Sequence, residues 1–85
     1  MDAIGQTVKD YILETFLPGE DPRELTESTP LITSGILDSL ATLELVTFLE
    51  RQYGIELEAH DVDPSRLGTL DSIARLVRTK LEVQT

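Results

Sequence analysis

The apolar residues of this chain recur at helical spacing in three separate stretches, and this pattern limits the possible folds more than any other feature. An amphipathic helix carries apolar residues every three or four positions, so that they share one face. Pro18 and Gly19 follow the first stretch and would end a helix there. Its apolar residues are Ile4, Val8, Tyr11, Ile12, Phe16 and Leu17.

The second stretch begins at Leu40 and ends at Gly54, a typical helix stop. A step of about 100° per residue gathers its apolar residues on one arc. Leu40 falls opposite that arc, on the side predicted to face solvent. The predicted buried arc contains Thr42, Leu45, Val46, Leu49 and Tyr53, with Leu43 and Phe48 on its flanks, and the opposite side also contains Glu44, Thr47 and Arg51.

A last helix is predicted over residues 70–82, with Thr69 as its N-cap. Its apolar face would contain Ile73, Leu76, Val77 and Leu81. The preceding segment "EAHDVDPSRLG" is predicted to be a loop with one short helical turn, and no segment sustains the period of two typical of a strand. The sequence therefore predicts an all-α fold, a four-helix bundle with three main helices and a short third helix.

Residues 18–38 show no sustained period, which predicts a long loop between the first and second helices. An unstructured connection of about 20 residues is uncommon in a compact domain, and such loops are often functional or held by their own side chains. The side chains expected to hold this one are Leu25, Leu31, Ile32 and Ile36.

Size and charge restrict the function. The 85 residues are expected to form a single domain, 1–85, with a modest core that disfavours an enzyme with a deep substrate pocket. With 7 basic and 16 acidic residues the net charge is −9, which repels nucleic acid but attracts a partner with a basic surface. The absence of cysteine excludes disulfides and thiolate chemistry. The basic residues near the chain end are interpreted as favourable charge at a helix C-terminus: Arg75, Arg78 and Lys80.

The beginning of the chain, "MDAIGQTVKDYILETF", carries early acidic residues and no continuous apolar run. It therefore has the features of neither a signal peptide nor a membrane span. From these features we expect a cytoplasmic protein, monomeric and without membrane or nucleic-acid partners.

The segment "GILDSL", residues 35–40, lies where the second helix begins. Asp38 is placed to cap the free N–H groups of that helix. Ser39 follows in the first turn, where free donors and the helix dipole favour an anion such as phosphate. Gly35 provides backbone freedom just upstream. An Asp–Ser pair is also an ordinary helix cap, and a single exposed leucine such as Leu40 is common, so this segment alone leaves both interpretations open.

"GILDSL" resembles the G-x-x-D-S-[LM] signature of the acyl and peptidyl carrier proteins. The likeness covers nearly the whole chain: residues 29–64 carry most of it, and "LGTLDSIARLV" matches the last helix of the family. The resemblance implies that Ser39 receives 4′-phosphopantetheine from coenzyme A through a phosphopantetheinyl transferase. The thiol of this arm would then hold an acyl or aminoacyl group as a thioester, on a carrier that is not itself an enzyme.

The resemblance also implies a partner surface. Asp38 and Leu40 would flank the attachment point, with Asp38 helping the transferase to bind and Leu40 serving as an apolar anchor for partner enzymes. We expect Ile55 and Val62 near the arm or its cargo. The partners implied are the transferase, a loading enzyme (an adenylating ligase or an acyltransferase) and downstream synthases. The predicted partner-binding residues are Leu40, Leu43, Glu44, Thr47, Glu50 and Arg51.

The chain departs from the carriers of fatty acid synthesis, whose second helix is usually strongly acidic. Ala41 occupies a position that is often acidic there, Thr47 one that is often a larger apolar residue, and Arg51 adds a positive charge. We therefore interpret the chain as a discrete carrier of specialised metabolism, of polyketide or non-ribosomal peptide type. A fatty acid synthesis carrier and an unmodified helical adaptor remain alternatives.

His60 suggests two further kinds of site, a metal site and a hydrolase active site. With Asp61 and Asp63 it could ligate a metal, but these residues lack the spacing of a structural zinc site or of a calcium loop. A Ser–His–acid hydrolase would need His60 to reach Ser39, and no G-x-S-x-G motif is present. We favour a solvated loop at 60–63 and predict no metal site.

Overall fold

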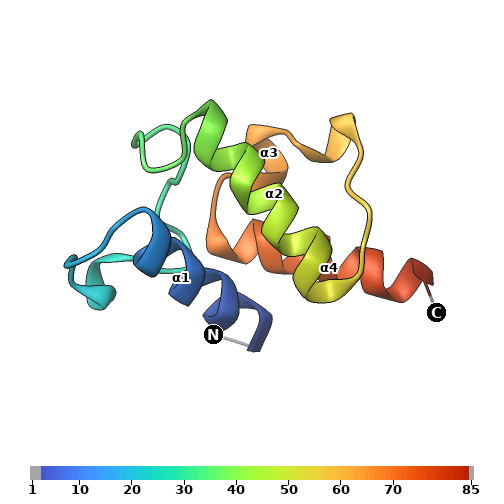
Figure 1. Ribbon diagram of the computed structural model, residues 1–85, viewed down its shortest axis with the longest axis horizontal. Helices are drawn as coiled ribbons and strands as arrows, with labels where there is room; N and C mark the ends of the chain where they lie inside the picture. Colours follow the sequence, from blue (N-terminus) through green and yellow to red (C-terminus); the bar gives the residue numbers. More distant parts are fainter. Residues whose placement is uncertain (1–2, 85) are drawn as a thin grey trace.

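The computed structural model describes residues 3–84, which form helices, turns and loops and no strand (Figure 1). Three helices are long: α1 (Ala3–Thr15), α2 (Ser39–Tyr53) and α4 (Leu70–Gln84). The predicted short third helix is α3 (Pro64–Leu67). The all-α prediction is therefore confirmed. Two 3-10 turns were not predicted, η1 (Pro22–Glu24) in the long loop and η2 (Ala59–Asp61) before α3.

Helix α4 is the element against which the other helices pack. It contacts α1, α2 and α3, and in Figure 1 it runs behind α2. Burying apolar area in this way is the main favourable contribution to the stability of so small a domain. The buried side chains that form one hydrophobic core are Val8, Ile12, Leu25, Leu31, Leu37, Ala41, Leu45, Val46, Leu49, Ile55, Leu67, Leu70, Ile73, Leu76 and Val77.

The buried face of α2 matches the predicted arc at its centre and differs at its edges. Leu45, Val46 and Leu49 are buried as predicted, whereas Thr42 and Tyr53 are only half-buried. Ala41, at a position that is often acidic in fatty acid synthesis carriers, is buried. It lies four residues before Leu45 and therefore on the same face of the helix. The missing charge at Ala41 thus reflects packing and carries no information about a partner.

The loop between α1 and α2 is held by its own side chains and by backbone hydrogen bonds. Leu25 and Leu31 are buried and Ile32 and Ile36 half-buried, as expected, and Leu37 is buried as well. The Leu31 amide donates to the Gly68 carbonyl over 2.7 Å, and the Leu37 amide donates to the Leu31 carbonyl over 2.8 Å. A further bond runs from the Asp71 amide to the Glu27 carbonyl over 3.1 Å. The loop is therefore attached to Gly68, between α3 and α4, and to the first turn of α4.

Asp61, predicted to lie in a solvated loop, is buried, with 3% of its surface exposed. Its carboxylate accepts a hydrogen bond from the Glu58 amide over 3.0 Å and lies 2.8 Å from Lys80 Nζ. The hydrogen bond to Lys80 is the main cause that lowers the pKa of Asp61. Lys80, interpreted from the sequence as general charge at the end of a helix, therefore has a specific partner that ties η2 to α4.

The described part of the chain has no helix that is both long and apolar enough to cross a bilayer.

Candidate functional site

Ser39 is the first residue of α2, and the residue before it caps the helix. The Asp38 side chain accepts a hydrogen bond from the Ala41 amide over 2.8 Å, as predicted. The Asp38 carbonyl accepts the first helical bond, from the Thr42 amide over 2.8 Å. The amides of Ser39 and Leu40 have no intrahelical acceptor at this position. The serine side chain is therefore attached to the positively polarised end of a 15-residue helix.

The side chains at this tip are open to solvent. Asp38, Ser39 and Leu40 are all exposed, Leu40 to 66%. Gly35, four residues before Ser39, has a φ of 86°, a left-handed conformation that other residues rarely adopt. No heavy atom lies within 4 Å of the place where a Cβ would stand at Gly35, so the glycine is needed for its backbone conformation. The turn that presents Ser39 thus depends on the residue type at position 35.

A cavity of about 600 Å³ lies beside Ser39. Its apolar wall includes Ile32, Leu37, Val62 and Leu67, which come from the long loop, the segment after η2 and α3. Val62, 38% exposed, lines the same cavity as Ser39, and its contact with the arm stays a prediction. Ile55 does not line this cavity: it is 3% exposed and belongs to the hydrophobic core.

Two carboxylates line the same cavity, those of Asp38 and Asp63. Hydrogen bonds from the Ser65 amide and then from the Ser65 hydroxyl lower the pKa of Asp63, so it is ionised at neutral pH. A phosphate on Ser39 would meet these negative charges on one side and the free amides of the helix start on the other. This arrangement favours a phosphate group that stays at the solvent-exposed tip of α2.

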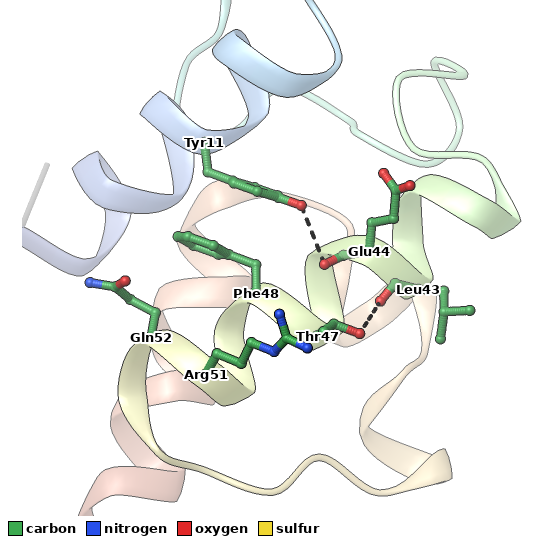
Figure 2. Close-up of a pocket in the computed structure, with 7 residues that line it drawn as sticks. All are labelled: Tyr11, Leu43, Glu44, Thr47, Phe48, Arg51 and Gln52. Atoms are coloured by element: carbon green, nitrogen blue, oxygen red, sulfur yellow. Dashed lines mark hydrogen bonds between the residues drawn. The ribbon is translucent and has the colours of Figure 1, made fainter.

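The predicted partner surface occupies the outer side of α2 (Figure 2). Leu43 is 62% exposed and points away from the bundle, and the Thr47 hydroxyl donates to its carbonyl over 3.1 Å. Glu44 and Arg51 are also exposed on this side. Glu50 differs, because it is half-buried and its carboxylate accepts a hydrogen bond from the Leu57 amide over 3.0 Å. That carboxylate holds the segment after α2.

Sequence analysis missed the contribution of α1 to this side of α2. The rings of Tyr11 and Phe48 stack with centroids 3.9 Å apart, and the Tyr11 hydroxyl donates to the Glu44 carbonyl over 3.3 Å. Both residues line an open groove of about 520 Å³ together with Leu43 and Arg51 (Figure 2). Phe48 had been placed on the flank of the apolar arc, but one sequence does not show which residue of α1 would meet it.

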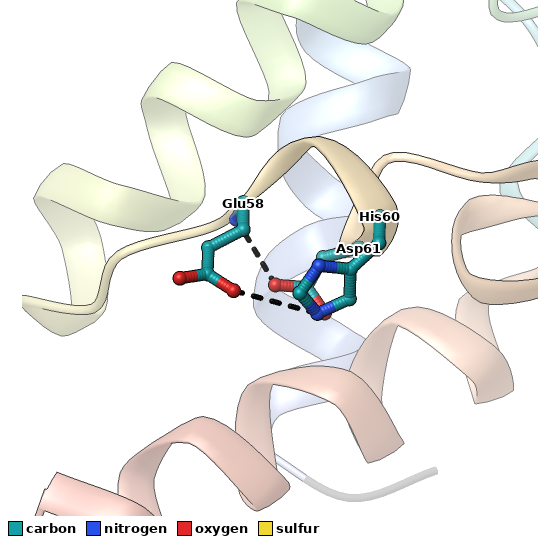
Figure 3. A group of neighbouring side chains, drawn as sticks. All are labelled: Glu58, His60 and Asp61. Carbon is teal, nitrogen blue, oxygen red and sulfur yellow. Dashed lines mark hydrogen bonds and ion pairs between the residues drawn. The ribbon is translucent and has the colours of Figure 1, made fainter.

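His60 lies with Asp61 in η2, next to Glu58, the residue that precedes η2 (Figure 3). Ligand atoms of the three lie within 4.8 Å of one another, and His60 Nε2 is 3.4 Å from Glu58 and 3.6 Å from Asp61. The Asp61 carboxylate is already bonded to Lys80 and to the Glu58 amide. Asp63, grouped with His60 in the sequence, instead caps α3. His60 is not among the residues that share the cavity with Ser39, so the structure gives no support to a Ser–His pair.

Asp38→Ala is expected to destabilise the protein by about 1 kcal/mol, because the Ala41 amide would lose its capping acceptor. Urea unfolding followed by circular dichroism measures this change. Asp38→Asn keeps a side-chain oxygen and should restore most of the loss. If Asp38→Ala were as stable as the wild-type protein, the capping role of Asp38 would be contradicted.

Comparisons with known proteins point to one family. Residues 11–77 match the family model described as "Phosphopantetheine attachment site". The chain is 32% identical over 69 residues to the probable acyl carrier protein PigG of Serratia sp. (strain ATCC 39006), covering 81% of this chain and 78% of that protein. It is 31% identical over 72 residues to the D-alanyl carrier protein of Lacticaseibacillus casei (strain BL23), covering 85% of this chain and 86% of that protein. A chain in the crystal structure of an FAD-dependent dehydrogenase superposes with a TM-score of 0.75 at 30% identity, covering 82% of this chain and 97% of that chain.

Proposed function

This chain belongs to the family of phosphopantetheine-binding carrier proteins, and we propose that Ser39 is the residue that carries the arm. The family is one of non-catalytic carriers with covalently attached 4′-phosphopantetheine, added by a phosphopantetheinyl transferase. The observation that supports Ser39 most directly is its exposed hydroxyl at the capped start of α2, beside a cavity. Residues 1–85 would then form one carrier domain.

The residues around Ser39 fit such a group. The free amides at the start of α2 suit a phosphodiester, and Val62, Leu37 and Ile32 offer an apolar wall beside it. When bound, the arm supplies the thiol on which an acyl or aminoacyl group is carried as a thioester. Ser39 fixes the end of the arm to a rigid helix, and Asp38 keeps that helix start ordered through its bond to the Ala41 amide.

We further propose that the carrier serves polyketide or non-ribosomal peptide type biosynthesis. Glu44 and Glu50 are the acidic residues of α2, and the Glu50 carboxylate is engaged with the Leu57 amide. Arg51 adds an exposed positive charge. This helix is thus less acidic than is usual for a carrier of fatty acid synthesis. The two curated relatives carry the names of an acyl carrier and of a D-alanyl carrier, which supports either an acyl or an aminoacyl load.

The partners we propose are the transferase, an adenylating ligase or acyltransferase that loads the arm, and downstream synthases. We place them in the cytoplasm, where coenzyme A is available as the donor of the arm. They would contact Leu40, Leu43, Glu44, Thr47 and Arg51, which are all exposed.

The attachment is tested by incubating the purified protein with coenzyme A, magnesium and a broad-specificity phosphopantetheinyl transferase, followed by intact mass measurement. A gain of one phosphopantetheine per chain is the expected result. No gain under conditions that modify a control carrier would contradict the proposal and favour the competing function, an unmodified helical adaptor. Testing which adenylating or acyltransferase enzyme charges the modified form would then identify the cargo.

Leu40→Ala is expected to lower kcat/KM for this modification about tenfold, because the transferase would bury less apolar area at this exposed side chain. Its stability should change little, since the side chain is exposed in the free protein. Thr79→Ala, at an exposed position of α4, is the control and should leave kcat/KM unchanged. An unchanged kcat/KM for Leu40→Ala would show that the transferase does not use this side chain.

A further inference from the structure

A second cavity, of about 250 Å³, lies close to the Ser39 site. Ile36 lines this second cavity, whereas its neighbours Gly35 and Leu37 line the cavity beside Ser39. The loop before α2 therefore contributes to both. Because Ile36 precedes Ser39 by three residues, their Cα atoms are at most about 11 Å apart. The loop that leads to Ser39 therefore also forms part of the wall of the second cavity.

The floor of this second cavity is apolar. Leu13 and Leu17 come from α1 and the turn after it, Leu25 follows η1, and Ile36 comes from the end of the long loop. Leu25 is 3% exposed and the other three are half-buried, so the floor continues into the hydrophobic core. Pockets for drug-sized ligands measure roughly 300–1,000 Å³. This cavity is smaller than that range and has room for a single long side chain.

The rim of the cavity is negatively charged, with Glu20, Asp21 and Glu24 around the apolar floor. Arg23 pairs with Asp21 over 3.0 Å, and its side chain is 90% exposed. The hydrogen bonds from Arg23 lower the pKa of Asp21, which is therefore ionised at neutral pH. Glu20 and Glu24 are exposed and form no ion pair with any residue that the structure describes. Two carboxylates at the rim therefore have no ion-pair partner among the described residues, while Arg23 and Lys9 place positive charge near Asp21.

We propose that this cavity is a docking pocket for one lysine or arginine side chain of the phosphopantetheinyl transferase. Such a side chain lays its alkyl stem on apolar surface and keeps its charged head at the rim. The net charge of −9 draws a basic surface toward the chain and raises the rate of encounter. The inference rests on the proposed function, because the transferase is the partner that must reach the Ser39 oxygen itself. Loading enzymes need to reach only the far end of the arm.

The proposal is tested with the double variant Glu20→Gln/Glu24→Gln and the matched control Glu14→Gln/Glu56→Gln, which removes the same charge at exposed positions outside the cavity. The cavity variant is expected to show about fivefold lower kcat/KM for modification than the control, since each exposed charge pair contributes modestly. The difference should shrink at high salt. Equal kcat/KM for the two double variants would overturn the proposal.

A second measurement tests the chemistry of the pocket without the enzyme. Titration of the 15N-labelled protein with n-butylguanidinium should give saturable amide shifts at Leu17, Glu20, Leu25 and Thr29, and n-butylurea, its neutral analogue, should not. Glu20→Gln/Glu24→Gln should weaken these shifts and the control should keep them. Shifts spread over the whole acidic surface would contradict the proposal. Both double variants keep Ser39. If only the pocket proposal is wrong, both variants are still modified. If the proposed function is wrong, no variant is modified.

Discussion

Ser39→Ala is expected to abolish covalent attachment of phosphopantetheine, the largest effect that any single substitution in this chain should have. The substitution removes the only atom at this position that could be esterified. The fold should survive, because the side chain is exposed and alanine is the residue most favourable to a helix. Intact mass after treatment with coenzyme A and the transferase measures attachment, and far-ultraviolet circular dichroism confirms that the helices remain.

Ser65→Ala is the matched control for that result. Ser65, like Ser39, is an exposed serine in the first turn of a helix that an aspartate caps. It lies in the four-residue helix α3, and its hydroxyl donates to Asp63 over 2.8 Å. This variant should gain the full mass of one arm. A mass gain that survives Ser39→Ala would move the attachment site to another hydroxyl and contradict the assignment.

Lys80→Met is expected to reduce the free energy of unfolding by about 2–3 kcal/mol, the largest effect on stability expected from a charged residue of this chain. The substitution leaves the buried Asp61 carboxylate without its cation, and breaking a buried pair in this way is costly. Solvation by water reduces this cost, because the site of the Lys80 side chain is 22% exposed. Urea unfolding at pH 7, with equal slopes for both proteins, measures the difference.

The control for Lys80→Met is Arg75→Met on the same helix. Arg75 pairs with Asp71 over 3.2 Å, but their side chains are 75% and 47% exposed, so this loss should stay within about 0.5 kcal/mol. Equal losses for the two variants would contradict a special role for the Asp61 pair.

The stability deficit of Lys80→Met should also depend on pH. The pKa of Asp61 is lowered from 3.8 in the folded protein. The carboxylate therefore contributes stability above its unfolded pKa, and this contribution is lost as the pH falls through the folded pKa. The deficit should be complete at pH 7 and shrink in the acid range around and below 3.8. A deficit of the same size at low pH would show that the methionine acts through packing.

Local signals in the sequence predicted the helices and the placement of Ser39. Asp38 and Gly54 each act through the backbone next to them, as N-cap of α2 and as its left-handed C-cap. The period of the apolar residues located the core of α2 and α4 because burial follows from helical geometry. What remained ambiguous was the meaning of the Asp–Ser pair, since a cap and an attachment site have the same local chemistry. The resemblance to a family, and not the periodicity, favoured the carrier.

Contacts between distant residues could not be predicted in this way. Asp61 pairs with Lys80 across 19 positions, so a charged turn that looks solvated is in fact part of the packed interior. Glu50 reaches the Leu57 amide, although its place on the helix suggested a free charge. In each case the deciding fact is a neighbour in space that periodicity along one helix does not show.

The hydrogen bonds that attach the long loop to Gly68 and to the first turn of α4 bear on how readily the carrier binds a partner. With the Leu31 amide on Gly68 and the Asp71 amide on Glu27, the loop already has the shape that an incoming enzyme would meet. Association then requires little ordering of the chain, and its entropic cost is correspondingly small. A surface that is ordered before binding therefore allows a complex to form at a small entropic cost.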